Sequence, residues 1–351
     1  DMLAHFAASR RWVRLPLAAL VALALAGPPP RALAVSLTLF VTITTDTADG
    51  NCNFDCSLRE AIDAANANPG ADRIEVPQGT YVLTISGASE DLNASGDLDL
   101  REDVTIVGSG ADKVIITLGG DTDDRVLQIV PGVTATISGL TLAGGKAGAA
   151  PGGAIYSQGV LTLANSVVRN SSGASGGGIA SSGFLTLTNV TVKDNVSAGA
   201  GGGVASQAPL VVGGSTFSGN QAGGSGGGIS ASAPVGITTS AVVGNIAGGS
   251  GGGISASAAL TLGDTTLSEN QAAGSGGGIQ SAGQLSITAG TLAGNSAGAS
   301  GGGISSSGSA TLTNVTISAN SAGSGGGLAN SGSATLASLT LANNSASAGN
   351  G

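Results

Sequence analysis

The chain is poor in histidine, aromatic residues and charge. Its single histidine is His5, and of its 351 residues only 2% are aromatic and 9% are charged. The 12 Lys and Arg residues are outnumbered by 21 Asp and Glu, which gives a formal net charge of -9. Such a surface has no basic region that could displace counterions from phosphates. The sequence therefore excludes a nucleic-acid-binding protein.

Residues 1–34 have the pattern of a secretory signal peptide. Arg10, Arg11 and Arg14 precede an apolar run over residues 15–27, and Ala-Leu-Ala at residues 32–34 forms a small-residue cleavage site. The run is too short for a transmembrane anchor and ends at Gly-Pro-Pro-Pro. We therefore expect an exported protein that begins at Val35, with no histidine and no transmembrane segment in its mature part.

The two cysteines, Cys52 and Cys56, lie close together in the sequence. In an exported chain this spacing favours a local disulfide. A metal site is the alternative, but it needs two further ligands. The sequence after the signal peptide has no histidine or third cysteine to supply them.

Glycine is abundant, and its 62 residues would indicate disorder if they had no period. From Gly152 onward they fall in a unit such as residues 301–320, GGGISSSGSATLTNVTISAN, which returns about every 25 residues. A period of this length predicts a solenoid. The unit ends in an asparagine that keeps the same period, and we expect these side chains to form an internal amide ladder: Asn170, Asn195, Asn220, Asn245, Asn270, Asn295, Asn320 and Asn344.

Each repeat contains three short extended pieces, and none is long enough for a helix. Pairs such as Leu260 and Leu262 flank one threonine, which is the period of two of a half-buried strand. Three strands per coil, stacked on copies of themselves, predict an all-β protein with the fold of a parallel β-helix. Glycine would permit close stacking of the coils at a corner.

A short helix is predicted before the first coils. Ser57 and Glu60 have the spacing of a capping box, apolar residues follow at helical spacing, and residues 66–70 end the helix. We expect this helix to cover the open first coil. Residues 35–351 then form one domain, with a capping segment at 46–70, irregular coils at 71–150 and eight regular repeats at 151–351. Because the repeats stop without a polar cap, we expect the natural chain to continue past Gly351, with an anchor or translocation domain.

Two short motifs resemble known families. Residues 56–61 spell CSLREA, and the surrounding sequence resembles exported bacterial right-handed β-helix proteins that share this motif. GGAI at residues 152–155 and FSGN at residues 217–220 resemble the repeats of chlamydial polymorphic outer-membrane proteins. These resemblances imply a right-handed β-helix on the cell surface or secreted, an adhesive passenger that binds glycans or neighbouring cells. They imply no catalytic residue and no cofactor.

Catalysis, if present, must lie early in the chain. Residues 46–124 contain seventeen Asp and Glu, whereas only Asp194, Asp264 and Glu269 follow residue 152. A polysaccharide lyase using Ca²⁺, or a glycosidase, would need such carboxylates with a basic residue. The structural interpretation is a solvated turn at residues 121–124 and a strand at residues 97–100 with its Asp side chains outside. The candidates are Asp97, Asp99, Asp121, Asp123, Asp124 and Arg125.

Threonines on the predicted outer face form two columns, and such flat arrays can order water and bind ice. Val211, Gly236 and Ala241 interrupt the columns, and threonine is also a common polar strand residue. The leading hypothesis is therefore a non-enzymatic surface β-helix, with a carbohydrate-active enzyme and an ice-binding protein as alternatives. The columns are Thr162, Thr186, Thr261, Ser286, Thr311 and Thr335, and Thr191, Thr216, Thr266, Thr291, Thr316 and Thr340.

Overall fold

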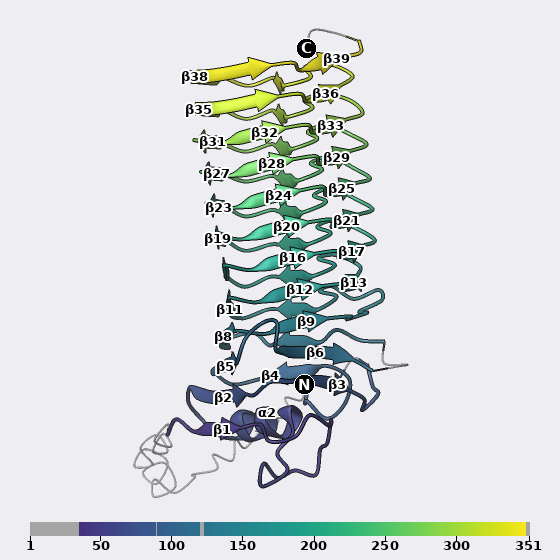
Figure 1. Cartoon of the computed structure of the whole chain (residues 1–351), viewed down its shortest axis with the longest axis vertical. Coiled ribbons are helices and arrows are strands. Elements are labelled where there is room, and N and C mark those ends of the chain that lie inside the picture. Colours follow the sequence, from purple (N-terminus) through teal and green to yellow (C-terminus); the bar gives the residue numbers. More distant parts are fainter. Residues whose placement is uncertain (1–34, 89, 120–122, 349–351) are drawn as a thin grey trace, which may run out of the picture. The chain divides into compact units, whose positions relative to one another are not determined.

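The computed structural model describes residues 35–88, 90–119 and 123–348, and these form one parallel β-helix (Figure 1). The predicted signal peptide, Asp121 and residues 349–351 lie outside the described residues. Every strand pair that connects successive coils is parallel and in register, as between Ile254 and Ile279. The predicted fold class is therefore confirmed. The described part of the chain contains no helix long and apolar enough to span a membrane.

One strand of each coil belongs to a ten-stranded sheet that runs along the rod. The aliphatic residue that closes each glycine run, such as Ile254, begins the strand and is fully buried, except for the half-buried Leu328 of the last strand. The strands are β4 (Leu98–Leu100), β7 (Leu127–Ile129), β10 (Ile155–Ser157), β14 (Ile179–Ser181), β18 (Val204–Ser206), β22 (Ile229–Ala231), β26 (Ile254–Ala256), β30 (Ile279–Ser281), β34 (Ile304–Ser306) and β37 (Leu328–Asn330).

A 21-stranded sheet takes the other two predicted extended pieces of each coil. Leu260 and Leu262 point into the core, whereas Thr261 between them is exposed. The strands are β1 (Thr38–Phe40), β2 (Asp72–Val76), β3 (Gly79–Leu83), β5 (Val104–Gly108), β6 (Val114–Leu118), β8 (Thr134–Ser138), β9 (Thr141–Ala143), β11 (Val160–Ala164), β12 (Val167–Arg169), β15 (Leu185–Thr188), β16 (Thr191–Lys193), β19 (Leu210–Gly213), β20 (Thr216–Ser218), β23 (Val235–Thr238), β24 (Ala241–Val243), β27 (Leu260–Gly263), β28 (Thr266–Ser268), β31 (Leu285–Thr288), β32 (Thr291–Ala293), β35 (Ala310–Ser318) and β38 (Ala334–Ala342).

A third, eight-stranded sheet consists of two-residue strands that follow the asparagine turn. Most regular coils therefore have four short strands, where the sequence predicted three. These two-residue strands are too short to show the alternation of aliphatic and polar residues that indicates a strand in the sequence. They are β13 (Ser172–Gly173), β17 (Val196–Ser197), β21 (Gln221–Ala222), β25 (Ile246–Ala247), β29 (Gln271–Ala272), β33 (Ser296–Ala297), β36 (Ser321–Ala322) and β39 (Ser345–Ala346).

The helix α2 (Leu58–Ala67) lies at the first coils and packs against β1, β2 and β4 (Figure 1). The Ser57 hydroxyl accepts from the amide of Glu60, and the Glu60 carboxylate accepts from the amide of Ser57, which is the predicted capping box. Leu58, Ala61 and Ile62 are buried. The apolar face of the helix therefore continues the core of the solenoid.

Close backbone stacking explains the glycine run. A Cβ on Gly227 would lie 2.4 Å from the carbonyl oxygen of Gly252 in the next coil and 2.6 Å from that of Ile246. Gly226 has a φ of +74°, a backbone conformation that residues with a side chain rarely adopt. The corner therefore admits no side chain at Gly227, because the neighbouring backbone occupies that volume.

We predict that Gly227→Ala lowers the free energy of unfolding by about 2–4 kcal/mol, because the coils must move apart. Gly236→Ala is the matched control, since a Cβ there meets nothing within 4 Å and its φ is negative. We expect it to be neutral or stabilising by up to about 1 kcal/mol. Urea denaturation checks both, and equal losses in the two variants would contradict this account of the corner.

Candidate functional site

A ladder of buried asparagines runs through the regular coils. The Asn245 side chain donates to the carbonyl of Phe217 at 3.0 Å and to Oδ1 of Asn270 at 2.9 Å. Its own Oδ1 accepts from the backbone and side-chain amides of Asn220. The same pattern joins Asn195, Asn220, Asn245, Asn270, Asn295, Asn320 and Asn344.

Asn170 is not part of the ladder, which corrects the prediction. Val168 pairs with Val192, so the coil at this point has 24 residues and Asn170 aligns with Asp194. Asn170 is exposed with a φ of +53°, and the backbone amide of Ser171 donates to Oδ1 of Asn195 in its place. The 25-residue step from Asn170 to Asn195 therefore arises by coincidence.

The segment that contains the CSLREA letters is organised by a buried arginine. Arg59 is 0% exposed, and its Nε lies 2.8 Å from Oδ1 of Asp46. Its guanidinium also donates to the carbonyls of Asn93, Gly96 and Asp97. Arg59 thereby joins the helix to the segment that leads into β4. This role was not predicted from the sequence, although an arginine beside the apolar positions of a helix is a signal for it.

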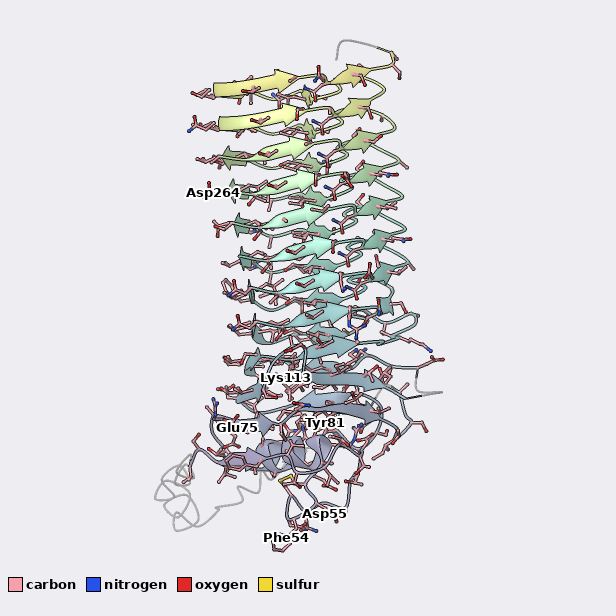
Figure 2. All side chains as sticks on the ribbon, in the orientation of Figure 1. Phe54, Asp55, Glu75, Tyr81, Lys113 and Asp264 are labelled. Atoms are coloured by element: carbon pink, nitrogen blue, oxygen red, sulfur yellow. A yellow bond between two sulfur atoms is a disulfide. The ribbon has the colours of Figure 1, made fainter. Side chains whose placement is uncertain are left out.

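Glu60 and the cysteine loop complete this end of the molecule. Burial alone would raise the pKa of Glu60, but hydrogen bonds from the backbone amides of Ser57 and Asp49 outweigh it and lower the pKa. Cys52 and Cys56 form a disulfide. The loop between them carries Phe54, which is 99% exposed and projects from the base of the rod with Asp55 (Figure 2).

Four of the six predicted catalytic candidates come together on the ten-stranded sheet. Arg125 donates to Oδ2 of Asp97 at 3.2 Å and also to Gln128, and Asp124 accepts from the amide of Arg125. Asp99 accepts from the amide of Asn93 at 2.9 Å. Asp123 is exposed and takes no part, and Asp121 lies outside the described residues.

These carboxylates are buried, which corrects the expected solvated strand and turn. Asp97 and Asp99 are 0% exposed and Asp124 is 4% exposed. Both strand aspartates do point away from the coil interior, but the segment Glu90–Gly96, with Asn93 fully buried, covers them. Burial raises the pKa of Asp97 to about 8 and that of Asp99 to about 7, and neighbouring carboxylates add to both effects.

Within the described residues, no three His, Cys, Asp or Glu side chains are arranged to hold a metal ion. Asp121 lies outside the described residues. Enclosed carboxylates paired with Arg125 are out of reach of a polysaccharide in this arrangement.

A shallow groove continues from this cluster along the outer face of the ten-stranded sheet. Asp99, Gln128 and Tyr156 are paired across β4, β7 and β10, and the same column continues through Ala180 and Ala205. Two hollows of about 60 and 270 Å³ share Ala205 and Gln207 in their linings. Eight serines supply most of the remaining lining, and neither hollow is lined by a charged residue: Ser175, Ser181, Ser182, Ser206, Ser230, Ser232, Ser255 and Ser257.

Tyr156 forms one end of the groove, and its ring is held in place by Arg125. The Arg125 guanidinium lies 5.5 Å from the centre of the Tyr156 ring, a cation–π arrangement. Gln280, which accepts from the Ser255 hydroxyl at 3.0 Å, follows the last serine of the groove. A larger hollow of about 340 Å³ beside Phe40 and Val76 has Glu75 as its one ionisable lining residue, and Arg73 pairs with Glu75. The groove therefore offers more hydrogen-bonding groups than this hollow.

The two threonine columns lie on the 21-stranded sheet. Thr191 pairs with Thr216. Thr266 pairs with Thr291, which in turn pairs with Thr316 in the following coil. Ala241 interrupts this column between Thr216 and Thr266, as predicted from the repeat. The other column is interrupted at Val211 and Gly236.

Removal of a ladder side chain leaves buried polar groups without partners. We predict that Asn245→Ala lowers the free energy of unfolding by about 2–5 kcal/mol, because the Asn220 amides and the Phe217 carbonyl lose their partner. Gln271→Ala on the exposed side of the next turn is the control and should change it by less than about 0.5 kcal/mol. A small effect of Asn245→Ala in thermal and urea denaturation would show that the ladder is not a stabilising element.

Removal of Arg59 should be equally damaging. We predict that Arg59→Met lowers the free energy of unfolding by about 3–5 kcal/mol, because the Asp46 carboxylate, 2% exposed, is left unpaired. Arg73→Met removes the exposed ion pair with Glu75 and should cost about 0–1 kcal/mol. Similar losses in both variants would contradict the organising role of Arg59.

Comparison with family models matches residues 214–232 and 264–282 to the Chlamydia polymorphic membrane protein repeat. Both segments contain a ladder asparagine, Asn220 or Asn270, and the glycine corner that follows it. The predicted resemblance of the repeats is thus confirmed. The CSLREA resemblance and export stay predictions. No curated protein matches the chain.

Among solved structures, the chain is similar to the pectate lyase Pel9A, with 14% identity, a TM-score of 0.49, and coverage of 87% of this chain and 79% of that chain. It is also similar to the A-module of the mannuronan C-5 epimerase AlgE6 from Azotobacter vinelandii. There the identity is 15%, the TM-score is 0.39, and the coverage is 86% of this chain and 99% of that chain. At such identities the similarity concerns the fold alone.

Proposed function

We propose that this chain is an exported, surface-displayed β-helix that binds an extended neutral glycan along the outer face of its ten-stranded sheet, without catalysis. The observation that supports this proposal most is the groove from Tyr156 to Ser255. It follows the axis of the rod, and its lining offers hydroxyl, amide and methyl groups but no charge. A linear chain of sugar hydroxyls could lie along it and form hydrogen bonds at each coil.

The chemistry of the lining favours neutral over acidic glycans. The protein has a net charge of -9, and no charged residue lines the two hollows of the groove. A polyuronate would therefore be repelled by the protein as a whole and would find no cation in the groove. Tyr156 supplies an aromatic face at the rim, and Gln207 an amide. Aromatic rings pack well against the apolar faces of sugars, because both surfaces are flat and apolar.

Repetition compensates for the shallowness of each position. The hollows of about 60 and 270 Å³ are smaller than the enclosed sites of small ligands. Ser230 and Ser255 occupy equivalent positions in successive coils, about 4.8 Å apart. A polymer that contacts several such positions at once binds more tightly than any single contact allows. This suits an adhesin-like scaffold better than an enzyme with one deep site.

A carbohydrate-active enzyme is the second candidate. The observation that favours it is that Asp97, Asp99 and Arg125 lie on the same sheet as the groove, beyond Tyr156. Burial of these groups argues against it in the observed arrangement. Ice binding is a third proposal, which is supported by the hydroxyl columns of the 21-stranded sheet and is tested by thermal hysteresis.

We predict that the protein binds soluble neutral polysaccharides in affinity electrophoresis and does not bind alginate or polygalacturonate. Tyr156→Ala should weaken the dissociation constant about two- to tenfold, from the loss of about 0.5–1.5 kcal/mol of aromatic contact. Ser230→Asp should weaken binding more than Tyr156→Ala does, because it adds a negative charge to the floor of the groove.

Thr266→Asp is the matched control, because it adds the same charge on the exposed 21-stranded sheet. Equal effects of Ser230→Asp and Thr266→Asp would place the binding elsewhere. Turnover of any polysaccharide in the same panel, with or without Ca²⁺, that is lost in Asp97→Asn would establish the enzyme in place of the non-catalytic binder.

A further inference from the structure

Four buried carboxylates in the first coils have an oxygen without a hydrogen-bond partner among the described residues, and three of them belong to the cluster around Arg125. The oxygens of this cluster are Oδ1 of Asp97, Oδ1 of Asp99 and Oδ2 of Asp124. The three residues are between 0% and 4% exposed, so water does not satisfy them from outside. A buried ionised carboxylate that lacks partners is strongly unfavourable, and a protonated one is much less so.

The charges around the cluster do not neutralise three carboxylates. Arg125 faces Asp97, and its Nε has no partner among the described residues. Arg59 of α2 is paired with Asp46. The other ionisable groups near the cluster are Asp63 on α2, Glu90 and Asp91 on the covering segment, and Arg101 after β4. Negative groups outnumber positive ones, which favours uptake of protons.

The covering segment Glu90–Gly96 is fastened to the cluster through Asp99, and to the helix α2 through Asp63, to which the Asn93 side chain donates. The amide of Asn93 donates to Oδ2 of Asp99, and the amide of Asp99 donates to Oδ1 of Asn93. Gly96 donates to the carbonyl of Ile85, and Asp91 accepts from Gln128. The segment therefore closes directly over the carboxylates, and hydration of these groups requires its displacement.

We propose that Asp97 and Asp99 hold protons in the closed structure, and that loss of these protons releases the segment Glu90–Gly96 from the sheet. The segment is then a pH-dependent cover over the first coils. Burial raises the pKa of both groups, to about 8 for Asp97 and about 7 for Asp99, against an ordinary value of 3.8. Closure is therefore fully stabilised below about pH 4, weakens as pH rises, and loses this contribution above about pH 8.

Opening would lengthen the groove if the proposed glycan binding holds. Asp99 and Gln128 continue the column that contains Tyr156, so displacement of the segment would expose two more coils of the same sheet face. The added face carries Asp97, Asp99 and Arg125, which are charged at high pH. The cover itself is measurable without any glycan, so failure of the proposed function leaves this inference testable.

The test is hydrogen exchange of the full protein between pH 5 and pH 8, read at the amides of Asn93, Gly96 and Asp99. After correction for the intrinsic pH dependence of exchange, protection should fall by up to about tenfold per pH unit for each proton released. In the double variant Asp97→Asn/Asp99→Asn, which mimics the protonated groups, protection should stay constant. Asp264→Asn at an exposed corner is the control and should behave like the wild type.

A second measurement uses the unaltered protein. The side-chain carboxyl ¹³C signals of Asp97 and Asp99 should titrate well above pH 5, with and without a chelator. Titration of both groups near the ordinary value, or the same pH dependence of protection in the wild type and the double variant, would overturn the proposal. A shift of the titration on addition of a chelator would assign the site to a bound cation and would also overturn it.

Discussion

The structure depends on the need of each buried amide for a partner in the next coil. The glycine corner brings successive backbones so close that a side chain does not fit, and the asparagine beneath it spans two coils with both ends of its amide. The close approach of the backbones at the glycine corner and the hydrogen bonds of the asparagine ladder therefore depend on one another. The glycines and asparagines are therefore repeated, whereas outward positions vary, as at Val211, Gly236 and Ala241.

The first coils provide partners for their buried backbone groups without a repeated residue. No identical residue in the next coil accepts or donates hydrogen bonds there, and a long arginine side chain takes the place of the ladder. Arg59 donates to three backbone carbonyls of another segment, whereas each ladder amide donates to a carbonyl of the preceding coil and to the next asparagine. Asp46 provides the countercharge. The concentration of charged residues before residue 125 thus reflects the irregular shape of this end as much as any chemistry.

The fold was predictable from the sequence because its period and its alternation are both local patterns. The register was predicted less well. A coil of 24 residues at β12 and β16 places Ser171 where Asn170 was expected, although the 24-residue spacing of Leu161 and Leu185 marks the shorter step in the sequence. The site was predictable in part. Asp97, Asp99 and Arg125 meet because they lie on adjacent strands, but their burial depends on a non-repeating segment around Asn93. Tyr156, Gln128 and Arg59 were missed, because their roles arise from long-range contacts that the periodic pattern does not encode.

The uniform register of the regular coils has a consequence for how such a protein can change. A stretch of 25 residues inserted in phase adds one corner, one ladder amide and one position of the groove, and each new group finds the same neighbours as the old. Stability of stacked repeats is set by nearest neighbours, so such insertions leave both ends unaffected. The number of repeats, and with it the length of the β-helix, can therefore change without any change in the chemistry of its surface.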